Sequence, residues 1–513
     1  MVNLLFCFLK LLWYIHKCTK NGQWLMKRFI TTPIFYVNGS PHIGHAYTSI
    51  VADVLARFWR SIGYEVHFST GTDEHGIKVA QKAAALGLEP QEMCDSNSAK
   101  FSEMSKLMEV SYDDFVRTTQ DRHKQAAKCF WEMIEHDIYV DKYEGWYSVA
   151  DEMFISEDEV VDGKTLQGAE VVWLSEECYF FRLSKYRDRL VEYITSHDII
   201  LPAVRKNEVL SFLQEGLRDL AISRTRFSWG IQVPGSDKHV MYVWIDALVN
   251  YLTALGFPET LERVNEFMPE CIHIIGKEIL RFHAIYWLAF LMSANLPLPK
   301  VIFAHGWWLH DGRKMSKSQN NFVVIDDLVN AYGVDAVRYF LLREVRFGED
   351  GDYSDEAMFR RYRYDLAHDL GNLVQRTLMF AYKLGEFVPN YSEFTGDDEN
   401  ILSCAKELDI TSLMESFQIH LALEEIFRLV RMANQYIENN KPWELAKCGD
   451  ENRLNTVLTV LFEVIKHIAY ALYPFMPNIS SKICRFLKIE GVADVRFQRM
   501  QLECPEVLFP LQK

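Results

Sequence analysis

The chain has 513 residues, a length that predicts about three domains. Hydrophobic residues make up 49% and charged residues 24%, which excludes a disordered protein, and no apolar run reaches the length of about 18 residues that a membrane-spanning helix needs. The formal net charge is −15, so a nucleic-acid partner would have to be bound through local basic patches.

The beginning of the chain differs in composition from the rest. The first thirty residues carry four lysines and one arginine but no acidic residue and no serine. An acid-free, basic and apolar segment is typical of an organellar transit peptide, so residues 1–28 are predicted to be one, and the family resemblance described below implies the mitochondrial matrix as its destination. Two alternatives stay open. The apolar stretch Leu4–Ile15 also suits a secretory signal, or translation starts at Met26 and the protein is cytoplasmic.

The first predicted strand covers Phe29–Val37, which is rich in β-branched and aromatic residues. After a short turn an amphipathic helix follows, with Ser40 as its expected cap and Pro41 at its first position. His42 and His45 would then lie one turn apart at the helix start. Free backbone N–H groups and the positive end of the helix dipole favour a phosphate there.

Gly44 lies between these histidines and has no side chain that would keep a ligand ring away. An isolated pair of this kind would be interpreted as two surface histidines. A second strand, however, ends in the polar, glycine-containing segment Thr70–Gly76. Ligands bind at the carboxyl ends of the strands in a doubly wound parallel sheet, so the two segments together predict one nucleotide site.

Further strands are predicted at Glu270–Ile275 and Val301–Ala304. The second of these leads to the polar loop Asp311–Asn320, which contains Lys314 and Lys317. Lysine side chains supply mobile positive charges that suit a polyphosphate, and serine hydroxyls donate to phosphate oxygens. On its own, such a loop would be interpreted as solvated surface.

Taken together, two motifs resemble the signatures of the class I aminoacyl-tRNA synthetases. They are His42-Ile43-Gly44-His45 and Lys314-Met315-Ser316-Lys317-Ser318, in this order. Other segments resemble the methionyl-tRNA synthetase family within that class: Thr32–Asn38, Thr70–Gly76, Tyr242–Leu248, His273–Glu278 and Phe282–Trp287. The resemblance extends from Arg28 to the end of the chain and is closest to the mitochondrial and related bacterial forms.

This resemblance implies an α/β fold: a doubly wound, Rossmann-like parallel sheet that is split by a connective insertion and followed by an all-α helical bundle. After the presequence (1–28), the implied parts are the first half of the catalytic domain at 29–138, the insertion at 139–240, the second half with the lysine loop at 241–320, a stem-contact linker at 321–362 and an anticodon-binding bundle at 363–513. Long segments with helical apolar periodicity support the bundle.

The resemblance also implies the reaction. Methionine reacts with ATP, which carries Mg²⁺, to give methionyl-adenylate and pyrophosphate, and is then transferred to the terminal adenosine of tRNA(Met). Because the substrate carboxylate is the nucleophile, the protein has to supply positioning and positive charge. The implied catalytic residues are His42, His45, Lys314 and Lys317, and the implied ATP-binding residues also include Gly44 and Ser316.

Methionine recognition carries over from the family to eight residues: Pro33, Ile34, Tyr36, Asp73, Trp244, Ala247, Tyr251 and His283. Aromatic rings suit a polarizable thioether, and Asp73 can pair with the α-ammonium group. The hydroxyl of Tyr251 and a ring nitrogen of His283 are expected to approach the sulfur. Taken singly, Trp244, Ala247 and Tyr251 would be interpreted as the buried face of a helix.

In many relatives the insertion holds zinc through a cysteine knuckle. The ten cysteines of this chain are scattered and never form C-x-x-C. Ser148 and Asp151 stand where a cysteine pair would be expected, and only Cys178 is near. We therefore predict no structural zinc, and the cysteine pattern indicates a reducing compartment.

The family's anticodon-reading positions match Asn372, Arg376 and Trp443. Asn372 and Arg376 are four residues apart and would share one face of a helix, and Trp443 could stack on an unpaired base. A solvated arginine and a core tryptophan are the alternative interpretations. No further domain is expected after the bundle, which predicts a monomer without membrane attachment.

Three other functions stay open at this point: a class I synthetase for another amino acid, a small-molecule nucleotidyltransferase, and a non-catalytic tRNA-binding relative. The short insertion leaves no room for the editing domain of the branched-chain enzymes, and the missing zinc ligands disfavour the cysteine enzyme. A nucleotidyltransferase would leave the helical region unexplained. A non-catalytic relative would be expected to lack one of the four charged signature residues.

Overall fold

The computed structural model describes residues 19–20, 23–24, 26–148, 153–155, 159–165, 168–310, 312–314, 323–384, 386–387, 394–489, 500–501 and 504–510. The chain forms two compact units. The first runs to Ala52 and continues over Trp59–His305, and the second combines Asp53–Phe58 with the chain from Gly306 onward. The predicted transit peptide (1–28) lies largely outside the described residues.

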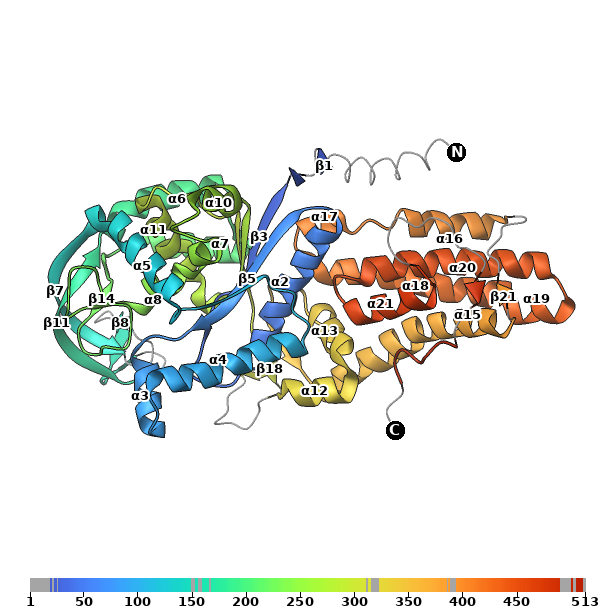
Figure 1. The fold of residues 1–513 in the computed structure, drawn as a ribbon, viewed down its shortest axis with the longest axis horizontal. Coiled ribbons are helices and arrows are strands. Elements are labelled where there is room, and N and C mark those ends of the chain that lie inside the picture. Colours follow the sequence, from blue (N-terminus) through green and yellow to red (C-terminus); the bar gives the residue numbers. More distant parts are fainter. Residues whose placement is uncertain are drawn as a thin grey trace. The chain divides into compact units, whose positions relative to one another are not determined.

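A seven-stranded parallel sheet forms the centre of the first unit (Figure 1). Its strands pair in the order β12-β17-β16-β3-β5-β4, and β6 also pairs with β5. Their bounds are β3 (Lys27–Thr31), β4 (Phe35–Tyr36), β5 (Glu65–Asp73), β6 (Asp114–Arg117), β12 (Ile200–Leu201), β16 (Cys271–Gly276) and β17 (Val301–His305). The predicted Rossmann-like parallel sheet is therefore confirmed.

The single strand predicted over Phe29–Val37 is observed as two strands, β3 and β4, which both pair in parallel with β5. Thr31 is opposite Ser69 and Phe35 is opposite Thr72, so the intervening segment of β3–β4 contains one residue more than β5. Pro33 lies in this bulge, where its missing N–H costs no ladder hydrogen bond. The bulge changes the direction of the side chains that precede β4.

Helices connect the strands of this sheet. The first half contains α2 (Ile43–Ser61), α3 (Ile77–Leu86), α4 (Pro90–Leu107) and α5 (Asp121–Met133). The second half contains α8 (Val243–Leu248), α9 (Asn250–Ala254), α10 (Leu261–Phe267), the π-helical η6 (Phe282–Trp287) and α11 (Leu288–Ser293). The core between them includes Phe130, Trp287 and Phe290, and no side-chain atom of these three is exposed to solvent.

The predicted insertion begins with the long hairpin of β7 (Ile138–Ser148) and β11 (Val171–Phe181) (Figure 1). With β8 (Met153–Ile155) and β13 (Leu220–Ala221) the hairpin forms a four-stranded antiparallel sheet. Within the range 139–240, however, Ile200–Leu201 returns to the parallel sheet as β12, between α6 (Arg187–Ser196) and α7 (Ala203–Gln214). Phe181 packs on Phe290 and so joins the insertion to the core.

The second unit begins with a small sheet of β18 (Trp308–His310), β19 (Arg313–Lys314) and β20 (Gly351–Tyr353). Helices α12 (Ile325–Tyr332) and α13 (Val334–Arg343) precede β20. After β20, α14 (Asp355–Arg360), the π-helical η8 (Arg361–Gly371) and α15 (Asn372–Lys383) follow one another directly. This small sheet and its helices occupy the range predicted for the end of the catalytic domain and the linker.

The helical region predicted for the end of the chain is confirmed. It contains α16 (Gly396–Lys406), α17 (Thr411–Glu415), α18 (Ile419–Asn440), α19 (Pro442–Cys448), α20 (Glu451–Leu472) and α21 (Pro477–Phe486). Helix α20 packs against α16, α18, α19 and α21 (Figure 1). It is long and apolar enough to cross a membrane, but most of its residues are buried inside this bundle.

A buried ion pair stabilises the second unit. The guanidinium of Arg338 donates from Nη2 to Oδ2 of Asp53 across 2.7 Å, and neither side chain is exposed to solvent. Nε of Arg338 also donates to the backbone carbonyl of Phe475, and Arg57 donates to the same Asp53 oxygen. The middle of helix α2, which starts in the first unit, is fixed in the second unit by this pair.

Candidate functional site

Polar side chains gather at the carboxyl edge of the parallel sheet in the first unit. Tyr36 ends β4, Asp73 ends β5 and Arg117 ends β6, and Tyr36 and Asp73 are opposite each other in the pairing of β4 with β5. Because all strands of this sheet are parallel, their carboxyl ends lie at one edge. The predicted site residues of the first two segments are therefore brought together.

Helix α2 begins at Ile43, and not at Pro41 as predicted with a Ser40 cap. The backbone carbonyl of His42 accepts from the N–H of Ala46, so His42 is the residue that caps the helix. Its ring Nδ1 accepts from the N–H of Gly44 at 3.1 Å, and the ring Nδ1 of His45 accepts from the N–H of His42 at 3.1 Å. The histidine rings thus accept from the backbone N–H groups of His42 and Gly44 at the helix start.

This capping fixes the tautomer of both imidazoles. A backbone N–H can only donate, so each Nδ1 must present its lone pair and each ring hydrogen must be on Nε2. The two rings lie 3.7 Å apart, centroid to centroid, and His45 also contacts the edge of Phe35 in β4. Both histidines therefore present a neutral Nε2–H donor, which suits an anionic ligand.

Gly44 is needed by the protein itself as well as by a ligand. A Cβ atom at this position would lie 3.0 Å from Cε1 and 3.1 Å from Nδ1 of His42. These contacts are tighter than side chains normally make, so with an alanine here the His42 ring would have to shift by a few tenths of an ångström. The glycine thus permits the ring arrangement at the helix start.

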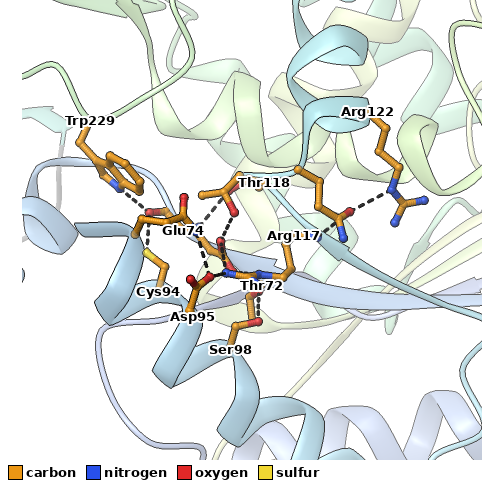
Figure 2. A network of polar contacts seen from close by, with 12 residues as sticks. Thr72, Glu74, Cys94, Asp95, Ser98, Arg117, Thr118, Arg122 and Trp229 are labelled. Carbon is orange, nitrogen blue, oxygen red and sulfur yellow. Dashed lines mark hydrogen bonds and ion pairs between the residues drawn. The ribbon is translucent and has the colours of Figure 1, made fainter. Parts of the chain in front are cut away.

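A buried polar network holds the end of β5 (Figure 2). The Glu74 side chain has no exposed surface and accepts from Nε of Arg117 at 2.6 Å and Nη2 at 3.1 Å. Thr72 Oγ1 donates to the same carboxylate, and the Glu74 backbone N–H donates to Thr118 Oγ1. Two charge-assisted bonds to one arginine fix a carboxylate in both position and orientation.

The same network reaches two further elements (Figure 2). Nε1 of Trp229 donates to the backbone carbonyl of Glu74 at 2.7 Å, and the Cys94 thiol of α4 donates to it at 3.3 Å. Burial raises the pKa of Cys94 to about 12, so this thiol is an inert donor. Asp73, which lies between Thr72 and Glu74, therefore sits on a rigid strand end.

Aromatic and imidazole side chains form a second group, on α8, α9 and η6. Trp244 stacks face to face on Phe282 with ring centroids 3.6 Å apart and an interplanar angle of 8°. Tyr251 lies 4.2 Å from His273 and 5.8 Å from Trp287, measured between ring centroids. The ring of His283 lies 6.5 Å from Trp244 and 5.8 Å from Tyr251, so these three predicted residues belong to one cluster, and Ala247 lies three residues after Trp244 on α8.

The contacts of His283 determine which atom donates and which accepts in each hydrogen bond of this cluster. Nδ1 of His283 lies 3.0 Å from the backbone carbonyl of Ile279, which can only accept, so Nδ1 carries the hydrogen. Nε2 of His283 must then accept from the Tyr251 hydroxyl, which lies 2.7 Å away. The Tyr251 hydrogen is therefore directed at His283 in this structure, and the approach of both groups to a ligand sulfur stays a prediction.

The cluster carries no net charge. Burial lowers the pKa of His283 to about 4 and lowers the pKa of His273 well below its usual value. Burial also raises the pKa of Tyr251 far above its usual value. A neutral aromatic surface of this kind suits an apolar, polarizable side chain and disfavours a charged one.

A cavity of about 270 Å³ lies among the helices of the second unit. Arg376 and Trp443 both line it, and the guanidinium of Arg376 lies 5.1 Å from the Trp443 ring centroid. Arg376 also pairs with Glu438 at 2.6 Å. Asn372 lies one turn earlier on α15 and does not line the cavity, so the structure brings together two of the three predicted residues here.

Comparisons with known proteins decide the family. The chain matches the tRNA synthetases class I (M) over residues 28–166 and 159–378, and the anticodon-binding domain of tRNA ligase over residues 398–501. The methionine–tRNA ligase of Brucella suis is 47% identical over 503 residues, which cover 94% of this chain and 98% of that protein. The chain belongs to the methionyl-tRNA synthetase family.

Other members of the family agree with this assignment. The methionine–tRNA ligase of Rickettsia felis is 46% identical over 465 residues, covering 89% of this chain and 91% of that protein. The methionyl-tRNA synthetase of Mycobacterium tuberculosis in complex with methionyl-adenylate has a TM-score of 0.91 at 45% identity, covering 95% of this chain and all of that one. The chain is therefore an aminoacyl-tRNA synthetase of the methionine–tRNA ligase type.

The lysine motif of the family is only partly described. Lys314 lies in β19, where it is opposite Leu309 of β18 in the second unit. Ser316 and Lys317 lie outside the described residues. Their assignment to ATP rests on the motif match and stays a prediction.

No group of three or more metal-ligating side chains occurs among the residues that the structure describes. Cys178 is buried in β11, and burial raises the pKa of its thiol to about 12. Ser148, at the end of β7, offers no thiol, and Asp151 lies outside the described residues. The absence of structural zinc stays a prediction.

Some residues of the site escaped the sequence analysis. Phe282, Glu74 and His273 were present in segments matched to the family but were given no role. Their signal is weak because an aromatic residue before a predicted histidine, or a glutamate after a predicted aspartate, has no distinctive spacing. Only the fold places them against Trp244, Arg117 and Tyr251.

Proposed function

We propose that this enzyme activates methionine with ATP to methionyl-adenylate, releases pyrophosphate, and transfers the methionyl group to the 3′-terminal adenosine of tRNA(Met). The observation that carries the proposal is that the Tyr251–His283 cluster and the Nε2–H donors of His42 and His45 lie in the same compact unit. The similarity to a structure that contains methionyl-adenylate also supports it.

The phosphate end of ATP would bind at the start of α2. The Nε2–H groups of His42 and His45 can donate to phosphate oxygens without first taking up a proton. The positive end of the helix dipole also favours the negative charge of the phosphate. Mg²⁺ would arrive with ATP as part of that substrate. Lys314 and Lys317 would neutralise the leaving pyrophosphate, and this part of the proposal rests on the motif match.

Methionine would bind with its two ends in different parts of the first unit. The Asp73 carboxylate would pair with the α-ammonium group, and Pro33, Ile34 and Tyr36, in and after the bulge, would line the space beside it. The thioether would contact Trp244, Ala247, Tyr251 and His283. The substrate carboxylate attacks the α-phosphorus, so the protein needs no nucleophile of its own.

The anticodon of tRNA would bind at the cavity of the second unit. Trp443 can stack on a base, and Arg376 and Asn372 can donate to base edges. In the structure Arg376 is held by Glu438, so a base would have to compete with that ion pair. Lys383 also lines the cavity and supplies a second positively charged group near the base.

The decisive experiment is amino-acid-dependent ATP–pyrophosphate exchange with each of the twenty amino acids. We expect methionine to be the only strong substrate, and tRNA(Met) to be charged in a second assay with radioactive methionine. A stronger signal with another amino acid would overturn the proposed specificity. Exchange without charging would overturn the tRNA step alone.

We also propose that the enzyme acts as a monomer in the mitochondrial matrix. The acid-free, basic presequence supports this localisation, although the three relatives named above are bacterial. Import of the full chain into isolated mitochondria, with removal of a peptide that ends before β3 (Lys27–Thr31), tests the targeting. Light scattering of the purified enzyme tests the oligomeric state.

A further inference from the structure

A single buried carboxylate connects the two parts of the methionine site. Oδ2 of Asp246 lies 2.6 Å from Nδ1 of His75, and Oδ1 lies 2.8 Å from Nε2 of His123. The side chains of the three residues are exposed by 1%, 4% and 0%. The other ring nitrogen of His123 lies 3.0 Å from Oγ1 of Thr253. We call these four residues the Asp246 clamp.

The clamp joins segments that are far apart in the sequence. His75 follows the ammonium-binding residue Asp73 by two positions, at the end of β5. Asp246 lies on the short helix α8, between Trp244 and Ala247. Asp73 and Trp244 are thus each two residues from a member of the same hydrogen bond.

Thr253 extends the clamp to α9, which also carries Tyr251. His123 contributes from α5, which packs on α9. The thioether-binding residues on α8 and α9 are therefore fixed to one carboxylate, and the strand end that carries Asp73 is fixed to the same carboxylate.

Burying this carboxylate costs free energy, so stability of the fold alone does not explain it. A carboxylate removed from water is stable only when it is paired and hydrogen-bonded, and apolar packing would stabilise the fold at least as well. Both oxygens of Asp246 have a histidine donor, and the coulombic and hydrogen-bond interactions with His75 and His123 lower its pKa to about 2 despite burial. Asp246 therefore stays ionised, but it is too deeply buried to contact a substrate.

We propose that Asp246 is a positioning residue that sets the distance between the ammonium-binding and thioether-binding parts of the site. This inference rests on the proposed function, because it assigns Asp73 and Trp244 to opposite ends of methionine. If the distance between Asp73 and Trp244 is fixed, an amino acid with a longer side chain than methionine fits the site less well. Loss of the clamp should therefore weaken methionine binding and relax selection against a longer analogue, with little effect on ATP.

The test compares Asp246→Asn with a matched control in the same unit. Asp137 is also a carboxylate with 1% exposure, and it accepts from Lys185, Tyr186 and Ser293, none of which is a predicted site residue. Asp137→Asn therefore removes an equally buried charge away from methionine. Both variants should unfold at a lower urea concentration than the wild type.

Pyrophosphate exchange then separates the two roles. For Asp246→Asn we expect the KM for methionine to rise about tenfold while the KM for ATP stays within about twofold, the size expected for one charge-assisted hydrogen bond. The preference for methionine over ethionine, which is one methylene longer, should fall about threefold. Asp137→Asn should keep the wild-type values of both ratios.

Three results would overturn the inference. They are equal changes in both KM values for Asp246→Asn, an unchanged methionine-to-ethionine ratio, or a rise in the methionine KM for Asp137→Asn of the same size. If Asp246→Asn does not fold, His123→Phe removes one of the two donors and decides the matter, with a rise of about threefold expected for the methionine KM alone. A wild-type enzyme without methionine-dependent exchange would instead overturn the proposed function, and the inference with it.

Discussion

Tyr251 donates its hydroxyl hydrogen to Nε2 of His283 across 2.7 Å, and both side chains are almost completely buried. This bond has two consequences. It directs the tyrosine hydrogen at His283, and it holds His283 in the tautomer that Ile279 also requires. The pair is therefore one neutral, hydrogen-bonded unit, and it is the unit that we propose to contact the thioether.

Tyr251→Phe should weaken methionine use more than ATP use. The change leaves a buried ring nitrogen of His283 without its donor, which costs about 1–3 kcal/mol, and kcat/KM for methionine should fall about tenfold. Pyrophosphate exchange with methionine and ATP varied in turn measures the effect. Tyr186→Phe is the control, since Tyr186 is also buried but bonds to Asp137. An equal loss in the control would contradict the role.

The buried histidines predict a pH dependence of stability. The pKa of His283 is about 4 in the folded state because of burial, against an ordinary value of 6.5. Between these values the unfolded chain binds more protons, so the free energy of unfolding should fall as pH decreases from 6.5 toward 4 and be independent of this group above about 7. Urea unfolding at several pH values measures the slope.

His283→Gln is the matching variant. It removes one group that is neutral when folded and protonated when unfolded, so the slope below pH 6.5 should decrease by about 1.4 kcal/mol per pH unit. An unchanged slope would mean that His283 is protonated in the folded enzyme. His273, whose pKa is also lowered by burial, should keep part of the slope in this variant.

Several parts of the site could be predicted because they are local in the sequence. The strand, turn and helix around His42 and His45 follow from a short run of residues, and Asp73 stands at the end of an apolar strand. Even here the helix start was wrong by two residues, because histidine side chains replaced Ser40 as the cap. Propensity alone does not favour histidine at that position.

The remaining parts depend on contacts between distant segments. Asp246 bonds to His75 and His123, and each of these polar residues, seen alone, would be placed on the surface. The return of Ile200–Leu201 to the parallel sheet is equally invisible, because a two-residue strand carries no periodic signal. Tertiary pairing, and not local pattern, decides both.

Gly44→Ala should reduce activity without unfolding the enzyme. The new Cβ atom would shift the His42 ring, whose Cε1 lies 3.0 Å from it, by a few tenths of an ångström, and the Nε2–H donor would move with the ring. We expect the pyrophosphate exchange rate to fall at least about tenfold, the loss typical of one misplaced donor. Alanine favours helix, so the urea midpoint should change little. Gly396→Ala is the control, since a Cβ atom there meets nothing within 4 Å.

The buried pair of Arg338 and Asp53 predicts a large loss of stability. Arg338→Met leaves the Asp53 carboxylate buried with Arg57 as its remaining charged partner, and should cost about 3–5 kcal/mol. Arg428→Met removes an exposed arginine that pairs with Glu425, and should cost less than about 1 kcal/mol. Urea unfolding of the two variants provides the comparison. An equal loss in the free energy of unfolding for both variants would show that the buried Arg338–Asp53 pair contributes no more to stability than an exposed ion pair.

We expect substitutions of Trp443 and Arg376 to impair the charging of tRNA and to leave the activation of methionine unchanged. Both residues line the cavity of the second unit, and the residues that we propose to bind the substrate methionine all lie in the first unit. Trp443→Ala should raise the KM for tRNA(Met) at least about tenfold, since loss of one base–aromatic stack costs about 1–3 kcal/mol.

Pyrophosphate exchange without tRNA should keep its wild-type rate in the same Trp443→Ala enzyme. Arg376→Gln should have a similar but smaller effect on charging, because Glu438 already engages the guanidinium in the free enzyme. Phe380→Leu, at another lining position of the cavity, controls for packing. If exchange fell together with charging in Trp443→Ala, the tryptophan would be a structural residue, and base recognition would have to be sought elsewhere on the bundle.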